Sequence, residues 1–341
     1  MRQYNLCILG FGNVGRALVR QLQAKQAELR EKYAIEWRIT GVATRRMGWI
    51  ADPDGLDPDA LLAGQMPAQQ STISDVREWL EAAREDVLFE LTSTDPHSGQ
   101  PAREHVRTAL ERGSYVITAN KGAVVHGYQD LQALAEANGT KFLFDAAVMA
   151  GAPVFSLFRD ALPAVNILRF RGLLNATSNV ILEEMEQGKS YDEAVSTAQA
   201  LGIAETDPSL DVDGWDAMLK LCAISTVLLD VPLQPQDVQR TGIRGLLSEQ
   251  VQAARAAGHP YKLAATLERT ENGVVARVQP EQIALGDPLA AASDAFMLLA
   301  HFEMDMIPGL TMILHVPGEG TAGPDVTAYD VLADFLRAVR A

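Results

Sequence analysis

The sequence has few cysteines, few basic residues and no long apolar run. Only 2 of its 341 residues are cysteines, and Cys7 and Cys222 lie far apart, in segments that resemble a strand and a helix. This usage excludes a disulfide framework and a cysteine-based metal site. A reduced, cytoplasmic setting therefore fits the chain.

The shortage of positive charge limits the classes of partner. The 29 basic residues are outnumbered by 44 acidic ones, which gives a net charge of −15. A nucleic-acid-binding surface needs clustered Lys and Arg, so we expect no nucleic-acid partner. A phosphate-bearing cofactor remains compatible with the sequence, because it needs only a local positive field.

No segment is predicted to cross a membrane. The longest apolar run, Phe142 to Phe158, contains Asp145, a glycine and a proline, and it is shorter than the roughly 20 residues that a spanning helix needs. The N-terminus leads directly into a strand-like segment and has no cleavable signal pattern. We therefore expect no membrane partner.

The chain does have enough material for two domains. Its length is large for one core, and its 48% hydrophobic residues can fill two. The irregular segment Met149 to Pro153 predicts a domain crossing, and the apolar spacing of a helix over Val326 to Val339 predicts that it packs back on the first domain. The expected domains are 1–150, completed by about 318–341, and 151–317.

The first domain opens with a pattern that is typical of dinucleotide binding. A buried strand predicted over Tyr4 to Gly10 runs into a G-x-G-x-x-G motif, and a helical segment follows. The motif consists of Gly10, Phe11, Gly12, Asn13, Val14 and Gly15. Its glycines let the backbone approach a pyrophosphate, whose charge faces the helix N-terminus. A plain glycine turn is the alternative, but the order strand, motif, helix favours nucleotide binding.

The second strand indicates which dinucleotide is bound. It is predicted over Glu36 to Ala43 and ends in Thr44, Arg45 and Arg46, without the acid that binds the ribose 2′-hydroxyl in proteins that prefer NAD. Two guanidinium groups suit a 2′-phosphate, so NADP is favoured over NAD. The alternative is a pair of solvated loop arginines.

Two further strand ends carry polar residues that we expect beside the cofactor. The strand Val87 to Leu91 is followed by Thr92 and Ser93, and the strand Ser114 to Thr118 is soon followed by Lys121. The carboxyl ends of parallel strands form the cofactor edge of such folds. Turn-forming hydroxyls and a solvated lysine are the alternatives.

Local patterns predict the other elements. The segment Asp52 to Gln70 is expected to be a surface excursion with little secondary structure, and Asn175 to Asn179 a polar loop. Helices are expected at Asp75–Glu85, Pro101–Arg112 and Tyr128–Asn138 and from Val180, and strands at Lys141–Val148, Ile167–Gly172, Gly273–Gln279 and Leu310–Val316. The strands of the second domain are expected to form an antiparallel or mixed sheet.

The second domain contains an acidic segment that ends in a lysine, Ala198 to Lys220. Asp213 is expected to be the N-cap of a helix on which Asp216 and Lys220 share one face. The apolar continuation Leu221 to Leu229 indicates a buried helix, and burial with carboxylates lets a lysine transfer protons. An ordinary surface ion pair is the alternative. The acids of the segment are Glu205, Asp207, Asp211, Asp213 and Asp216.

These motifs occur together, and in this order, in homoserine dehydrogenases. The chain resembles that family at Ala198, Gly202, Asp207-Pro208, Asp211-Val212, Gly214, Asp216 and Lys220, in GFGNVG, TANKG and GLLNATSN, and in a terminal glycine-rich turn before Thr327-Ala328. The resemblance covers nearly the whole chain and indicates the short form without a regulatory domain. It implies an α/β fold with a Rossmann-type dinucleotide-binding domain and a second α+β domain for substrate binding and dimerisation.

The resemblance also implies an activity and a set of roles. The activity is reversible oxidation of L-homoserine to L-aspartate 4-semialdehyde with NAD or NADP, on the route to threonine and methionine. Lys220 would donate and accept the substrate proton with Lys121 nearby, and Glu205 would bind the substrate amino group. Asp211 and Asp216 would complete the polar pocket, and Gly323 of the glycine-rich turn would lie at the cofactor.

The resemblance further implies a homodimer and a sodium ion. The sodium site would map to Asp145, Val148, Ala150 and Ala152. Asp294 and Met297 stand where the family has a glycine and an asparagine. One alternative therefore remains, namely a related dehydrogenase that acts on another small amino or hydroxy acid. A nucleotide-binding sensor without turnover is a second alternative, which Lys121, Glu205 and Lys220 disfavour.

Overall fold

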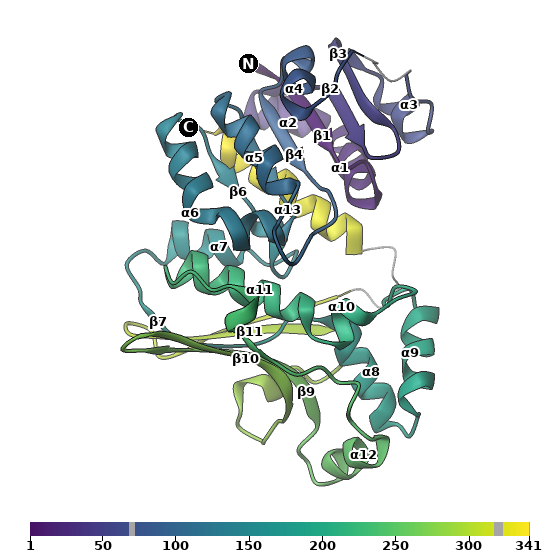
Figure 1. Ribbon diagram of the computed structural model, residues 1–341, viewed down its shortest axis with the longest axis vertical. Helices are drawn as coiled ribbons and strands as arrows, with labels where there is room; N and C mark the ends of the chain where they lie inside the picture. The colour runs from purple at the N-terminus through teal and green to yellow at the C-terminus, as the bar shows by residue number, and fades with distance from the viewer. Residues whose placement is uncertain (68–71, 317–322, 341) are drawn as a thin grey trace. The chain divides into compact units, whose positions relative to one another are not determined.

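The computed structural model describes residues 1–67, 72–316 and 323–340. The chain forms two compact units, Met1–Gly151 with Pro324–Ala341, and Ala152–Gly323. Each unit is built around one six-stranded sheet (Figure 1). The fold is therefore α/β with a second α+β unit, as the sequence predicts. Within the described residues, none of the helices has the length and the apolar composition that crossing a membrane requires.

The first sheet is mainly parallel and has the strand order β3-β2-β1-β4-β5-β6. β3 pairs antiparallel with β2, and the other pairings are parallel. Its strands are β1 (Arg2–Leu9), β2 (Ile35–Thr44), β3 (Gly48–Leu56), β4 (Val87–Glu90), β5 (Tyr115–Thr118) and β6 (Phe142–Leu143). Because β2 and β4 flank β1 on opposite sides, the carboxyl ends of β1 and β4 form a topological switch point, where such sheets bind ligands.

The helices of the first unit complete one hydrophobic core. They are α1 (Asn13–Ala24), α2 (Gln26–Tyr33), α3 (Pro58–Leu62), α4 (Val76–Ala83), α5 (Ala102–Glu111), α6 (Lys121–Ala137) and α13 (Gly323–Val339). α13 belongs to this core although it lies at the end of the chain, since the Phe335 ring lies 5.8 Å from those of both Tyr4 and Phe89. Figure 1 shows α13 in yellow beside the first sheet.

For three segments of the first unit, the predicted bounds of helices or strands were wrong. From Asp52 to Leu62 the predicted surface segment is not irregular: it continues β3 and then forms α3, which Asp57 caps and Pro58 begins. Residues 68–70 of this prediction lie outside the described residues. α6 begins at Lys121 and not at Tyr128, because Asn120 caps it. The strand expected over Lys141–Val148 ends at Leu143, and Asp145–Ala147 forms a 3₁₀ turn whose first amide donates to the Asp334 carboxylate at 2.8 Å.

The second sheet is mixed and has the strand order β12-β11-β7-β9-β10-β8. Its strands are β7 (Ile167–Leu173), β8 (Gln239–Arg240), β9 (Tyr261–Thr270), β10 (Gly273–Gln282), β11 (Met297–Met304) and β12 (Leu310–His315). Only the short pair of β10 with β8 is parallel among the described strands of this sheet. The sequence interpretation missed β9 and β11, which are buried along most of their length and therefore lack strict alternation.

Helices α8 and α11 pack against β9. The helices of this unit are α7 (Val154–Ser156), α8 (Ala176–Glu186), α9 (Tyr191–Ala200), α10 (Ser209–Val212), α11 (Trp215–Leu228) and α12 (Ser248–Ala256). The predicted loop Asn175–Asn179 is wrong, because Asn175 caps α8 and the other four residues form its first turn. This cap places Asn175 at the junction of β7 and α8.

Candidate active site

The glycine motif follows β1 at the switch point of the first sheet. An ideal Cβ on Gly10 would lie 2.4 Å from the Leu91 carbonyl oxygen, and one on Gly15 would lie 2.7 Å from the Gly10 oxygen. Gly10 also has φ +102°, a conformation that favours glycine. A Cβ on Gly12, in contrast, would meet no atom within 4 Å. Two glycines are therefore required by the fold, and the third leaves open space at the helix start.

The N-terminus of α1 is suited to a phosphate. Gly12 is its N-cap and provides no side-chain cap for the first-turn amides, and that turn contains no acid. Asn13 is exposed and Val14 is half-buried. Phe11 is buried, and the centroid of its ring lies 5.4 Å from Cζ of the Arg16 guanidinium. Uncapped amides and the helix dipole attract anions. The motif thus fits the pyrophosphate of a dinucleotide.

Arg45 and Arg46 lie in the turn between β2 and β3. Both are exposed, and neither forms an ion pair with any described residue. Thr44 ends β2 without an acid, and its hydroxyl accepts from the Met47 amide at 3.0 Å. Two unpaired guanidinium groups at this strand end are available for an anionic group.

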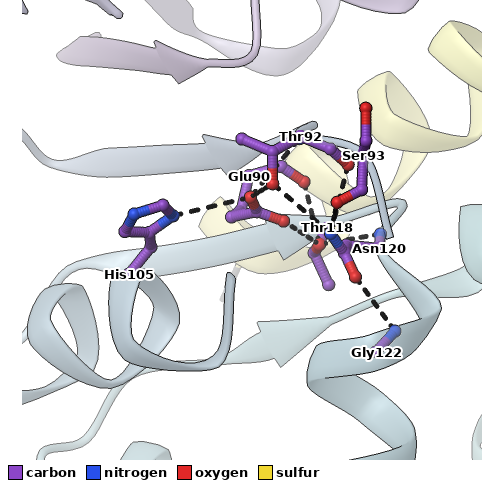
Figure 2. Close-up of polar contacts among 7 residues, drawn as sticks. All are labelled: Glu90, Thr92, Ser93, His105, Thr118, Asn120 and Gly122. Carbon is purple, nitrogen blue, oxygen red and sulfur yellow. Dashed lines mark hydrogen bonds and ion pairs between the residues drawn. The ribbon is translucent and has the colours of Figure 1, made fainter. Parts of the chain in front are cut away.

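The loops after β4 and β5 are joined by hydrogen bonds (Figure 2). Asn120 Nδ2 donates to the carbonyl oxygens of Thr92 at 3.1 Å and Ser93 at 3.3 Å. The structure therefore brings the predicted Thr92, Ser93 and Lys121 to one edge of the first unit, since Lys121 is the first residue of α6. Glu90, the buried end of β4 beneath these loops, was missed; its signal is an acid that ends an apolar strand.

The second unit holds its lysine among oxygen atoms. Lys220 Nζ donates to Asp216 Oδ2 at 2.7 Å and to the Leu174 carbonyl oxygen at 2.5 Å. The side chains of Lys220 and Asp216 are 14% and 18% exposed, so this pair is largely withdrawn from solvent. The prediction of a lysine close to a carboxylate at the start of an apolar helix is confirmed.

Asn175 links the two acids beside this lysine, and the sequence interpretation did not assign it a role. Its Nδ2 donates to Asp211 Oδ1 at 2.6 Å and to Asp216 Oδ2 at 3.0 Å, while its Oδ1 accepts from the Ser178 amide at 2.8 Å. Burial, and then the nearby Asp216 charge, raise the pKa of Asp211. The available signal was an N-cap residue just before a helical pattern.

Three acids of the segment lie elsewhere, and one of them, Asp207, accepts from the Ser209 amide at 3.1 Å. Asp213 does not cap α11, whose N-cap is Gly214 at φ +79°; its carboxylate binds Arg244 at 2.6 Å instead. The Glu205 side chain is exposed, and its backbone oxygen accepts from Gln199. The structure gives Glu205 no contact with the Lys220 cluster, which we define as Asn175, Asp211, Asp216 and Lys220.

The residues expected to hold sodium offer few side-chain ligands. Asp145 is buried, and its carboxylate accepts from Arg337 Nη1 at 2.7 Å. The other three, Val148, Ala150 and Ala152, have apolar side chains. In the part of the chain that the structure describes, no group of three or more His, Cys, Asp or Glu residues could hold a metal. Any ion at these positions would therefore be bound mainly by backbone carbonyl oxygens.

Three predicted residues remain. Asp294 and Met297 form local hydrogen bonds, and Gly323 is the first described residue after a gap. Asp294 Oδ1 accepts from the Phe296 amide at 2.8 Å, and the Met297 oxygen accepts from Asn179 Nδ2 at 3.1 Å. Gly323 is the first residue of α13, and a Cβ there would meet no atom within 4 Å. Residues 318–322 of the predicted glycine-rich turn lie outside the described residues.

Two family models together match nearly the whole chain. Residues 153–336 match a family described as homoserine dehydrogenase. Residues 10–145 match one described as the homoserine dehydrogenase NAD-binding domain. The two matches together include the glycine motif, both lysines and the acids of the Lys220 cluster.

Curated relatives and solved structures agree with these matches. The chain is 35% identical to an NAD(+)-dependent homoserine dehydrogenase of Pseudomonas canavaninivorans, over 98% of this chain and 96% of the relative. It is 30% identical to the crystal structure of a putative homoserine dehydrogenase from Archaeoglobus fulgidus, with a TM-score of 0.85 and full coverage of both chains. A hyperthermophilic archaeal homoserine dehydrogenase mutant in complex with NADPH is 26% identical, with a TM-score of 0.80 over 99% of this chain and 98% of that one.

Proposed function

The chain belongs to the homoserine dehydrogenase family, and on this premise we propose that it interconverts L-homoserine and L-aspartate 4-semialdehyde with Lys220 as general acid and base. It is an oxidoreductase with an NAD-binding domain. In the oxidation direction, Lys220 accepts the proton of the substrate hydroxyl, and in the reverse direction it returns that proton. Such acid and base catalysis contributes roughly 10² to 10⁴-fold in rate.

The observation that carries this proposal is the hydrogen bonding of the Lys220 ammonium. An ammonium has three N–H donors, and two of them are accounted for by Asp216 and the Leu174 carbonyl. The third N–H returns the proton to the substrate oxygen in the reduction direction. In the oxidation direction Lys220 starts as the neutral amine, and its lone pair occupies this third position and takes up the hydroxyl proton. Asp216 accepts a hydrogen bond from the ammonium that forms when the proton is taken up.

The first unit supplies the cofactor site in this proposal. The bound nicotinamide dinucleotide accepts or supplies the hydride. The first-turn amides of α1 bind its pyrophosphate, beside Gly10, Gly12 and Gly15. Arg45 and Arg46 would bind a 2′-phosphate, so we propose that the chain uses NADP as well as NAD.

The remaining roles are proposals that rest on family membership. Lys121 assists at the reacting end of the substrate, and Glu205 binds its amino group. Asp211 completes the polar pocket. The protein acts as a homodimer in the cytoplasm, and a sodium ion bound by carbonyl oxygens from Asp145 to Ala152 supports the local backbone.

A paired assay tests the proposed function. Purified protein is incubated with L-homoserine and either NAD or NADP at alkaline pH, and reduced nicotinamide is followed by absorbance. We expect homoserine-dependent reduction of at least one cofactor, and none with L-serine or L-threonine in place of L-homoserine. No reduction of either cofactor would reject the proposal, and faster turnover of another hydroxy acid would favour the related dehydrogenase.

A further inference from the structure

A fully buried carboxylate lies beneath the two loops at the cofactor edge. Glu90, the last residue of β4, is 0% exposed. No lysine or arginine in the described part of the chain pairs with it, and His105 Nδ1 lies 3.7 Å from Glu90 Oε1. Burial of a carboxylate is unfavourable unless hydrogen bonds replace its hydration. Glu90 therefore depends on the donors around it.

These donors come from the residues that follow β4 and from the end of β5. Oε1 accepts from the Thr92 amide at 3.3 Å and from the Thr92 hydroxyl, and Oε2 accepts from Thr118 Oγ1 at 3.1 Å. Figure 2 shows the three side chains converging between the two strands. The carboxylate thus connects the ends of neighbouring strands.

Glu90 also fixes the direction of the next hydrogen bonds. A hydroxyl has a single hydrogen. The Thr92 hydroxyl directs it to Glu90 Oε1, and the Thr118 hydroxyl shares it between the Glu90 backbone oxygen at 2.8 Å and Oε2 at 3.1 Å. Their lone pairs then accept from Asn120, whose backbone amide lies 2.9 Å from Thr118 Oγ1 and whose Nδ2 lies 3.4 Å from Thr92 Oγ1. Asn120 is the residue that joins the two loops and caps α6 through the Gly122 amide at 2.9 Å.

We propose that Glu90 is a positioning residue for the reaction, and that it acts through Thr92, Thr118 and Asn120 on Lys121. This inference rests on the proposed function, in which Lys121 assists at the reacting end of the substrate. Lys121 is held through its backbone, as the first residue of a helix whose cap belongs to this network. Misplacement of a reacting group by about 1 Å can reduce turnover about 100-fold.

The isosteric variant Glu90→Gln tests the inference. An amide NH₂ cannot accept, so the Thr118 hydroxyl keeps only the backbone oxygen of residue 90 as its acceptor, and its lone pairs are shared between the new NH₂ and the Asn120 amide. The link from position 90 to Asn120 is thereby weakened. We expect kcat to fall about tenfold, a smaller loss than a full displacement would give, because the fold and the other hydrogen bonds remain. The NADH dissociation constant, measured by fluorescence, should change by less than about threefold, since the glycine motif binds the phosphates. Hydrogen exchange should increase in residues 91–95 and 119–123.

Glu85→Gln is the matched control. Glu85 is another buried carboxylate, with its side chain 1% exposed, and it precedes β4 at the opposite end from Glu90. It binds Arg112 Nε at 2.7 Å and Ser114 Oγ at 2.8 Å. Its loss should lower the melting temperature and leave kcat and the exchange of both loops unchanged.

A second pair of variants tests the same link without changing Glu90. Thr118→Val removes the hydroxyl between Glu90 and Asn120 while it keeps the side-chain shape, and should reproduce the loss of kcat. Thr140→Val removes another buried hydroxyl of the same unit, which donates to the Ser114 carbonyl at 2.8 Å, and should not. This pair decides the inference if Glu90→Gln fails to fold.

The outcomes separate the two proposals. If the wild type is active and both Glu90→Gln and Thr118→Val lower only the melting temperature, with wild-type kcat and exchange, the inference is wrong and the proposed function stands. If the wild type is inactive with both NAD and NADP, the proposed function is wrong, and so is the role of Glu90 as a positioning residue for that reaction. Loop exchange in the variants then shows whether Glu90 orders the two loops.

Discussion

The two polar sites of this chain differ in how their charges are satisfied. In the Lys220 cluster of the second unit, the ammonium binds the Asp216 carboxylate, and Asn175 donates to both Asp216 and Asp211. At the cofactor edge of the first unit, the described polar contacts join backbone amides, carbonyls and hydroxyls around one buried carboxylate. Arg45 and Arg46, which follow β2 in the same unit, form no ion pair with any described residue.

This difference indicates a division of work. The first unit offers uncapped amides and open space, which suit a ligand that brings its own negative charge. The second unit holds Lys220, the residue proposed to transfer the proton, in surroundings that are already arranged, so little reorganisation would be needed when charge develops. Variants in the Lys220 cluster should therefore act on kcat, and variants at the cofactor edge should act on cofactor affinity.

Removal of the amine should have the largest effect. Lys220→Ala should lower kcat by roughly 100-fold or more, because the proton acceptor is lost, with less than about twofold change in NADPH affinity. Lys220→Arg should lose nearly as much, since a guanidinium keeps the charge but does not release its proton. The measurement is steady-state kinetics with saturating homoserine, together with cofactor titration.

Lys189→Ala is the control for this prediction. Lys189 lies in the same unit, pairs with Glu184 and is 41% exposed, so its removal should leave kcat unchanged. Wild-type turnover in Lys220→Ala would remove the amine from the mechanism. Retained turnover in Lys220→Arg would show that the site needs only a positive charge.

Removal of the Asn175 side chain should give the second-largest loss of kcat. Asn175→Ala removes the amide that donates to both Asp211 and Asp216, and a lost hydrogen bond to a charged group costs about 1.5 kcal/mol or more. We expect a decrease in kcat of about tenfold. The helix cap of α8 is lost as well, so Ser190→Ala, which removes only the cap of α9, is the control. If both variants lower stability alike and neither changes kcat, Asn175 is only a cap.

The double variant Arg45→Ala, Arg46→Ala tests the other half of the comparison. It should weaken NADP binding about tenfold and NAD binding less than twofold, because only NADP carries a 2′-phosphate, and about 1.4 kcal/mol is tenfold in affinity. The loss should shrink at high salt, since exposed charges are screened. Arg30→Ala, another exposed arginine of this unit, is the control. Equal losses for both cofactors would show that these two arginines are merely solvated.

Much of the first unit was predictable, because its order follows from the local sequence. Strands such as β1 are apolar on both faces and lie between turn residues, and the glycine motif marks the helix that follows. The extent of α6 was not predicted, because it depends on the Asn120 cap rather than on apolar periodicity. β6 was predicted too long since the chain leaves the sheet where the Asp145 amide binds Asp334, which is 189 residues away in sequence.

The site was predicted unevenly for a related reason. Asp216 and Lys220 are four residues apart on one helix, so their contact follows from helical geometry. Asn175 and Leu174 come from a different strand end, and sequence spacing does not relate them to α11. The family resemblance assigned Glu205 to the substrate site, but its side chain is exposed in the structure. Its role in binding the substrate amino group stays a prediction.

The smallest predicted effect is a change in stability at Asp211. Burial and Asp216 raise its pKa in the native state, so the native protein binds this proton more tightly than the unfolded chain. The free energy of unfolding then falls as pH rises from about 4, the ordinary carboxyl value, through the native pKa, and the loss persists above it. Asp211→Asn is neutral at every pH and can still accept from Asn175.

Asp211→Asn should therefore melt about 2–4 °C higher than the wild type at pH 8, and the difference should shrink as pH falls toward 4. Its kcat should be lower, because a polar group of the Lys220 cluster loses its charge. Asp207→Asn gives the opposite sign: the Ser209 hydroxyl and amide lower the Asp207 pKa, so that variant should be the less stable one at pH 8. Melting curves from pH 4 to pH 8.5 decide both. A destabilised Asp211→Asn at pH 8 would mean that the ionised carboxylate is stabilised by Asn175 and Lys220 more than it is opposed by burial, and the two polar sites would then be equally well satisfied.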